Sequence, residues 1–101
     1  MIVFADRVVV PGHVLVRNLY GEIVLLNLET EKYFGLDKTG TQMWETVTRA
    51  ATVEEAFEAL SSEFEVEPET LRDHLSDLLG QLVDNGLVQV VPADVESIPA
   101  I

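Results

Sequence analysis

The stretch Lys32-Tyr33-Phe34-Gly35-Leu36-Asp37 decides the fold of this chain. Its two adjacent aromatic residues favour a strand, and Gly35 leaves one face of that strand without a side chain at its position. Asp37 suits the N-cap of a helix, because its carboxylate can accept a hydrogen bond from a backbone N–H one or two residues into the helix. The stretch is therefore predicted to be a short strand at which the chain turns from sheet to helix.

Two more strands are predicted before this stretch. After the turn signal Pro11-Gly12, residues His13 to Leu19 alternate between two faces, and Tyr20-Gly21 breaks the strand. The second strand runs from Glu22 to Leu28, and a short polar turn connects it to Lys32. Connections this short favour antiparallel neighbours, so a three-stranded antiparallel sheet is predicted.

The second strand is apolar on both faces, with Ile23 and Leu25 on one and Val24, Leu26 and Leu28 on the other. A small antiparallel sheet usually has one solvent-exposed face, on which polar side chains alternate with the apolar ones. Two interpretations remain open. Helices or the N-terminal segment cover both faces, or part of this surface binds a partner chain.

Three helices are predicted after Asp37. The second begins with a capping box formed by Thr52 and Glu55, and the third begins at Pro68, which suits the first helical position. Gly86 supplies the left-handed residue that ends the third helix. The expected fold class is α+β, with an N-terminal three-stranded antiparallel sheet followed by three helices.

The third helix has an unusually wide apolar arc. Leu71, Leu75, Leu78 and Leu82 make one row, and Leu79 and Val83 widen it, so this helix is expected to contact two different surfaces. Gly80 lies inside this helix, where a glycine is either simply tolerated or allows close approach of another backbone, and close packing within the fold is the favoured explanation.

The chain is long enough for only one domain. Its 101 residues allow a single hydrophobic core. We expect one domain over residues 1–91 and a flexible C-terminal tail over residues 92–101, where few apolar anchors remain.

The charge balance excludes several classes of partner. A net charge of -12 repels the phosphates of DNA, RNA and anionic membranes. The chain has no cysteine, lacks a signal-peptide pattern and has no apolar run long enough to span a bilayer. The sequence therefore predicts a cytoplasmic protein that binds neither nucleic acid nor membrane.

Motifs for catalysis, metals and cofactors are missing. The two histidines, His13 and His74, lie far apart and have no carboxylates at metal-ligand spacing. The run Lys38-Thr39-Gly40-Thr41 lacks the glycine-rich loop of a nucleotide site. The sequence therefore predicts a non-enzyme that uses no metal and no cofactor.

From about Gly12 to Val88 the chain resembles the PqqD-like family, also called RiPP recognition elements. The matching residues are Tyr33-Phe34-Gly35-Leu36-Asp37, then Gly40 and Trp44, and finally Leu78-Leu79 with Gly86-Leu87-Val88. These small winged-helix-like domains act in the biosynthesis of ribosomally made, modified peptides. A free-standing chain looks most like the discrete recognition protein of lasso peptide pathways.

The resemblance implies a non-catalytic protein that captures the leader region of a precursor peptide as an extra antiparallel strand. The leader would lie beside the Lys32 to Leu36 strand in a groove closed by the third helix. The expected partners are the precursor leader peptide and the leader peptidase and macrocyclase of the same pathway. An exposed strand edge fits this role, because its unpaired N–H and C=O groups can bind another strand.

Carried over by position, the resemblance gives a backbone ladder, an apolar pocket and a polar rim. Whether Tyr33 or Phe34 faces the peptide is left open. The expected peptide-binding residues are Glu31, Lys32, Tyr33, Phe34, Gly35, Leu36, Arg72, Leu75, Ser76, Leu78, Leu79 and Leu82.

Other functions are weighed against this one. A PqqD-type peptide chaperone for a radical enzyme in quinone cofactor synthesis has the same sequence pattern. A winged-helix regulator would need basic or amide side chains on its recognition helix, whereas the third helix is mostly leucine and acid. A dimerisation module would bury the apolar sheet against its own copy, so the oligomeric state stays open.

Overall fold

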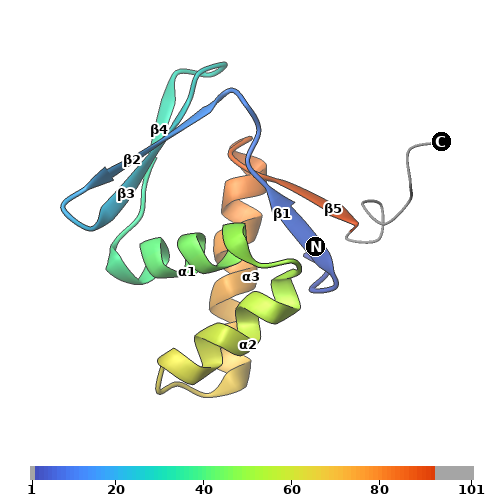
Figure 1. The fold of residues 1–101 in the computed structure, drawn as a ribbon. Coiled ribbons are helices and arrows are strands. Elements are labelled where there is room, and N and C mark those ends of the chain that lie inside the picture. Colours follow the sequence, from blue (N-terminus) through green and yellow to red (C-terminus); the bar gives the residue numbers. More distant parts are fainter. Residues whose placement is uncertain (1, 93–101) are drawn as a thin grey trace.

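The computed structural model describes residues 2–92. In chain order the elements are β1 (Asp6–Val9), β2 (Val14–Leu19), β3 (Glu22–Asn27), β4 (Lys32–Gly35), α1 (Lys38–Arg49), α2 (Val53–Glu63), α3 (Pro68–Asp84) and β5 (Gln89–Pro92). Figure 1 shows α3 running between the α2 end of the molecule and the end that carries β5. The prediction of an α+β fold, with a three-stranded antiparallel sheet followed by three helices, is confirmed.

The three-stranded sheet has the order β2-β3-β4, with both pairs antiparallel. A two-residue turn joins β2 to β3, in which Tyr20 and Gly21 both have positive φ angles of 57° and 88°. This geometry matches the right-handed twist of the strands that it connects. The side chain of Asn18 supports the turn by accepting a hydrogen bond from the Gly21 N–H at 2.9 Å.

A second, two-stranded sheet pairs β1 with β5, which bring together the two ends of the described chain. Local sequence patterns do not predict this pairing, because the paired residues are about eighty positions apart. Pro92 is the last residue of β5. The rest of the predicted tail, residues 93–101, lies outside the described residues.

The predicted helix ends are confirmed. Asp37 accepts a hydrogen bond from the Gly40 N–H at 2.8 Å, and Thr52 accepts one from the Glu55 N–H at 3.1 Å. Pro68 is the first residue of α3, and Gly86 has a φ of 69° just after its end. Local sequence chemistry therefore sets where α1, α2 and α3 begin and where α3 ends.

One core lies between the helices and the inner face of the three-stranded sheet. We define the inner face by Ile23 and Leu25, which are buried, and the outer face by Leu15, Arg17, Val24, Leu26, Tyr33 and Gly35. Leu15 and Tyr33 are exposed on the outer face. The interpretation that helices or the N-terminal segment cover both faces is therefore wrong.

None of the helices in residues 2–92 combines the length and apolar character that crossing a bilayer requires.

Two glycines of the third helix region differ sharply in their surroundings. A Cβ added at Gly80 would have no heavy atom within 4 Å, so no other backbone packs closely there, contrary to the expectation for this residue. A Cβ added at Gly86 would lie 2.9 Å from the side-chain nitrogen of Asn27, at a positive φ.

These surroundings predict opposite effects on stability. Gly80→Ala should raise the free energy of unfolding by about 0.5–1 kcal/mol, because alanine restricts the unfolded chain and favours the helix. Gly86→Ala should lower it by about 1–2 kcal/mol, because of the left-handed backbone and the clash with Asn27. Urea denaturation of both variants measures the difference, and the same sign of change in both would contradict these assignments.

Candidate peptide-binding site

Within residues 2–92, β4 is an edge strand, since only one of its sides is paired, with β3. The Leu36 N–H donates to the Ile23 carbonyl at 2.8 Å, so this pair is of the hydrogen-bonded type. Hydrogen-bonded pairs alternate along an antiparallel ladder, which makes Phe34 with Leu25 the next such pair. The backbone N–H and C=O groups of Tyr33 and Gly35 therefore point to the open edge.

The side chains of β4 alternate between the two faces of the sheet. Phe34 lies opposite Leu25 on the inner face, is partly buried and packs against the core. Tyr33 lies opposite Leu26 on the outer face and is 74% exposed. Phe34 thus faces the helices, and Tyr33 faces away from them.

The predicted pocket leucines of α3 fall into two groups. Leu75, Leu79 and Leu82 are fully buried in the core, whereas Leu78 is partly buried at its boundary. A fully buried side chain has no surface to offer a peptide unless the core opens. In the described structure, Leu78 is thus the one predicted leucine of α3 with accessible surface.

Arg72 and Ser76 lie on a different flank of α3. The Arg72 guanidinium stacks over the rings of Phe4 and Phe57, with its carbon 4.2 and 4.5 Å from their centroids, and approaches Glu54 at 3.3 Å. Ser76 lines a hollow of about 370 Å³ together with Ile2 and Val90, two residues from the part of the chain that carries β1 and β5. The structure does not bring these two residues together with β4.

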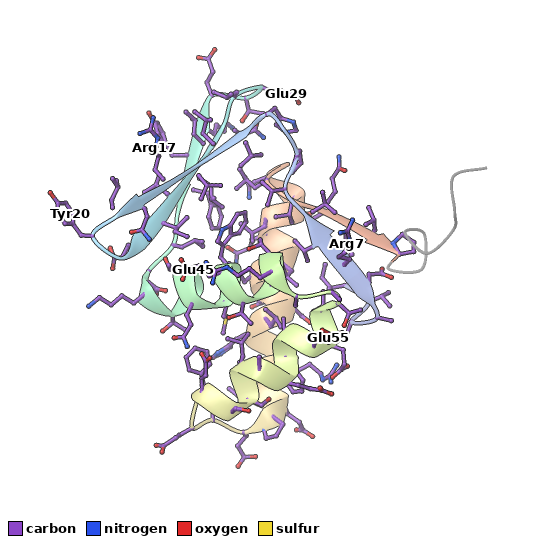
Figure 2. All side chains as sticks on the ribbon, in the orientation of Figure 1. Arg7, Arg17, Tyr20, Glu29, Glu45 and Glu55 are labelled. Carbon is purple, nitrogen blue, oxygen red and sulfur yellow. The ribbon has the colours of Figure 1, made fainter. Side chains whose placement is uncertain are left out.

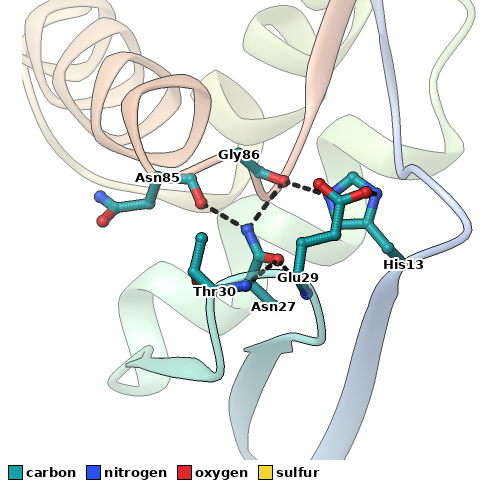
Figure 3. Close-up of polar contacts among 6 residues, drawn as sticks. All are labelled: His13, Asn27, Glu29, Thr30, Asn85 and Gly86. Carbon is teal, nitrogen blue, oxygen red and sulfur yellow. Dashed lines mark hydrogen bonds and ion pairs between the residues drawn. The ribbon is translucent and has the colours of Figure 1, made fainter.

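Asn27, at the end of β3, connects the sheet to the end of α3 (Figure 3). Its side chain is 3% exposed and donates to the Asn85 carbonyl at 2.9 Å. Its carbonyl oxygen accepts hydrogen bonds from the backbone N–H groups of Glu29 and Thr30 at 2.9 and 3.3 Å. One amide thus holds both the turn before β4 and the C-terminus of α3.

His13 joins the same junction from the start of β2. Its Nε2 donates to the Gly86 carbonyl at 3.1 Å, and its Nδ1 lies 3.7 Å from the Glu29 carboxylate. The ring is therefore a structural element rather than a free surface group. Within residues 2–92, histidines and carboxylates form no group of three that could hold a metal ion.

A hollow of about 750 Å³ opens beside this junction. It is lined by His13, Glu29, Lys32, Asp84 and Val90, among others, so it extends from the start of β4 to the end of α3 and β5. Neither the role of Asn27 nor this hollow was predicted from the sequence. The available signal was an asparagine at the end of an apolar strand and before a polar turn, where such side chains bond nearby backbone groups.

The junction predicts a stability effect for one conservative substitution. Asn27→Asp keeps an acceptor for Glu29 and Thr30 but loses the donor to Asn85 and places a carboxylate among carbonyl oxygens. The free energy of unfolding should fall by about 1–3 kcal/mol. Chemical denaturation measures this loss. Exposed Asn18, converted to Asp in the same way, is the matched control, and equal effects at the two positions would contradict the role of Asn27.

Three comparisons with known proteins bear on this site. The family model described as "Coenzyme PQQ synthesis protein D (PqqD)" matches residues 22–88, which span β3, β4 and all three helices. A comparison with curated protein sequences gave no match.

Two solved structures share the fold. One is described as "TbiB1 in Complex with the TbiA(beta) Leader Peptide"; it is 30% identical, with a TM-score of 0.72 over 80% of this chain and 94% of that chain. The other, "Lasso peptide synthetase B1 complexed with the leader peptide", is 20% identical, with a TM-score of 0.71 over 82% of this chain and 98% of that one. The likeness therefore extends over nearly the full length of both relatives.

Proposed function

The chain belongs to the PqqD family, and on this premise we propose that it binds the leader region of a ribosomally made precursor peptide as a strand added beside β4. The observation that carries the proposal is the open edge of β4, where the backbone groups of Tyr33 and Gly35 have no partner strand in the part of the chain that the structure describes. An extended peptide satisfies such groups with main-chain hydrogen bonds. Phe34, on the face toward the helices, would give the added strand an apolar contact.

The sheet has a second open edge, on β2. The Leu28 N–H donates to the His13 carbonyl, so the backbone groups of Val16 and Asn18 point to this edge. Two observations favour β4 over β2 as the place where the peptide adds. The family match starts at residue 22 and therefore includes β4 and α3 but not β2. In addition, β4 follows directly on the turn whose backbone N–H groups the Asn27 side chain holds.

The direction of the added strand decides where the peptide leaves β4. A peptide that binds antiparallel to β4 runs from the Gly35 end toward the Lys32 end of the strand. Its C-terminal continuation would leave β4 over the hollow lined by Lys32, Glu29 and Asp84. We assign this hollow to the residues that follow the bound strand, for which Lys32 offers a cation and Glu29 and Asp84 offer carboxylates.

The wider role in the proposal is delivery rather than catalysis. The recognition domain, residues 1–91, would hold the leader in the cytoplasm while a separate leader peptidase and a macrocyclase act on the rest of the precursor. The pathway favoured is lasso peptide maturation, because a structure 30% identical to this chain was solved with a leader peptide and the second structure is described as a lasso peptide synthetase component.

Binding of a synthetic leader tests this proposal. The leader of the precursor encoded beside the chain, labelled with a fluorophore, should bind with a Kd of about 1 μM or below in fluorescence anisotropy. A scrambled leader of the same composition is the control, because it keeps charge and length but loses the order of its side chains. Equal affinity for both peptides would contradict specific recognition.

A second candidate is a PqqD-type peptide chaperone in quinone cofactor synthesis. The description of the matching family model as coenzyme PQQ synthesis protein D favours it. The same anisotropy assay separates the two, with a quinone-cofactor precursor peptide in place of the lasso leader. Tighter binding of that peptide would move the chain to this second function.

A further inference from the structure

The larger hollow runs along an open edge of β5. Within residues 2–92, β5 pairs with β1 alone, so its other edge has no strand beside it. Gln89, Val90 and Val91 all line the hollow of about 750 Å³. Neighbouring side chains on a strand point to opposite faces, so a hollow that three consecutive residues line follows the edge of the strand. The two-stranded sheet therefore presents its unpaired edge to this hollow.

One face of α3 lies across from this edge. The second hollow, of about 370 Å³, is lined by five residues of α3, namely Ser76, Asp77, Gly80, Val83 and Asp84. Their spacing places them on a single face of the helix. Val83, Asp84 and Val90 line both hollows, so the two hollows adjoin. We call the combined space between β5 and this face of α3 the β5 groove.

Gly80 leaves space along the α3 side of the β5 groove. A glycine inside a helix lowers its stability relative to alanine. A Cβ added at Gly80 would meet no atom within 4 Å, so nothing in residues 2–92 fills the space that the missing side chain leaves. Glycine allows a ligand or a second backbone to approach closely. A backbone from outside residues 2–92 can therefore lie directly against α3 at this position.

The charge of the β5 groove is negative. Asp77 and Asp84 are exposed in it, and neither makes an ion pair with any of residues 2–92. Glu29, at the turn before β4 (Figure 2), adds a carboxylate where the groove meets β4. In the described chain, Lys32 is the sole Lys or Arg that lines either hollow, and it lies at the same end. Complementary charge in a bound peptide is therefore a Lys or Arg.

We propose that the β5 groove binds the part of the precursor that follows the strand added beside β4. That strand leaves β4 at its Lys32 end, where the groove begins, so the next residues enter the groove directly. They lie extended along the open edge of β5, with their backbone against Gly80 and a Lys or Arg beside Asp77 and Asp84. This inference rests on the proposed function and adds a second contact between precursor and protein.

The length of the groove sets the length of this segment. Ser76 and Asp84 are eight positions apart on α3, which corresponds to about 12 Å along the helix. An extended peptide covers this distance with about four residues. The six residues that follow the β4-bound strand are therefore enough to cross from β4 and to fill the groove.

Charge and connectivity favour the precursor over two other occupants. Residues 93–101 of this chain include Asp94 and Glu96 but no Lys or Arg, so the carboxylates of the groove repel them. A second copy of the chain brings a net charge of -12. The precursor segment is also covalently attached to the strand bound at β4, which raises its effective concentration at the groove.

Two labelled peptides from the precursor encoded beside the chain test this proposal. The short peptide is the shortest C-terminal truncation that still protects the Tyr33 and Gly35 amides from exchange. The long peptide carries the next six residues as well. Fluorescence anisotropy gives the affinity of each peptide, and the ratio of the two affinities measures the contribution of the groove.

Two variants alter the groove without touching β4. Asp77→Lys reverses a charge, and Gly80→Gln fills the space beside α3. Glu58→Lys and Ala59→Gln are matched controls, because they place the same side chains at exposed positions of α2 that line neither hollow. Asp77 is exposed and Gly80 has open space around it, so both groove variants should fold, which circular dichroism verifies. Either of the two alone is sufficient for the test.

We expect the wild type to bind the long peptide at least about fivefold more tightly than the short one. The groove variants should reduce this ratio to less than about twofold, whereas both controls keep the ratio of the wild type. All four variants should bind the short peptide as the wild type does. Replacing the Lys and Arg residues of the six added positions with Glu should remove the gain as well.

Three outcomes overturn the proposal. They are equal affinity of the wild type for the two peptides, a gain that the folded groove variants retain, and a gain that does not depend on Lys or Arg in the added segment. Absence of binding of any truncation to the wild type would contradict the proposed function instead.

Discussion

Replacement of Tyr33 by proline is expected to weaken leader binding at least about tenfold while the sheet stays folded. The Tyr33 N–H points to the open edge of β4, so proline removes a donor that the added strand would use and none that β3 uses. Proline is tolerated on edge strands when its missing N–H faces solvent. Anisotropy with labelled leader measures the loss, and circular dichroism verifies the fold.

Tyr33→Ala is the matched control for this prediction. Alanine keeps the backbone N–H and removes only a side chain that lies on the outer face, away from the helices. Its leader affinity should stay within about threefold of the wild type, which corresponds to less than 1 kcal/mol. If Tyr33→Pro bound leader as well as Tyr33→Ala does, recognition would not depend on the β4 backbone.

Replacement of Leu79 by alanine is expected to lower the free energy of unfolding by about 2–5 kcal/mol. Leu79 is fully buried and packs in the core with Leu75 and Leu82, so its truncation leaves a cavity. For a domain of this size, such a loss is a large part of the total stability. Urea denaturation measures it.

Leu78→Ala separates core packing from peptide contact. Leu78 is partly buried, so the same truncation should lower the free energy of unfolding less than Leu79→Ala does. Leader affinity, measured where each variant is folded, should fall more for Leu78→Ala than for Leu79→Ala. The reverse order would mean that the core opens when leader binds and that Leu79 contacts the leader, as predicted from the family resemblance.

Local signals predicted most of the fold. Asp37, Thr52, Pro68 and Gly86 mark helix ends through hydrogen bonds and dihedral angles that depend on a few neighbouring residues. The strands before them were recognised by alternation and by short turns, and the observed ranges differ from the predicted ones by at most one or two residues. Such features are readable because each is decided within one element or turn.

Features that depend on distant residues were not predictable in this way. The wide apolar arc of α3 did not reveal that Leu75, Leu79 and Leu82 lie in the core while Arg72 packs on Phe4 and Phe57. The pairing of β1 with β5 and the bonds from Asn27 to Asn85 also join segments far apart in sequence.

The candidate site also combines features set by local sequence with features set by residues far apart in the chain. Alternation along Lys32–Gly35 placed Tyr33 and Phe34 on opposite faces, but which of them faces the helices followed only from the register with buried Leu25. A slip of one residue would have exchanged the two faces. The identity of the edge strand was readable from the sequence, whereas the surfaces around it needed the tertiary structure.

Amide hydrogen exchange, followed by NMR with and without leader, tests strand addition at β4 most directly. If leader adds as a strand beside β4, it should slow exchange of the Tyr33 and Gly35 amides, which point to the open edge, and leave exchange of the Val16 and Asn18 amides at the β2 edge unchanged. Saturating leader that leaves Tyr33 and Gly35 unprotected, or that protects Val16 and Asn18 instead, would contradict it.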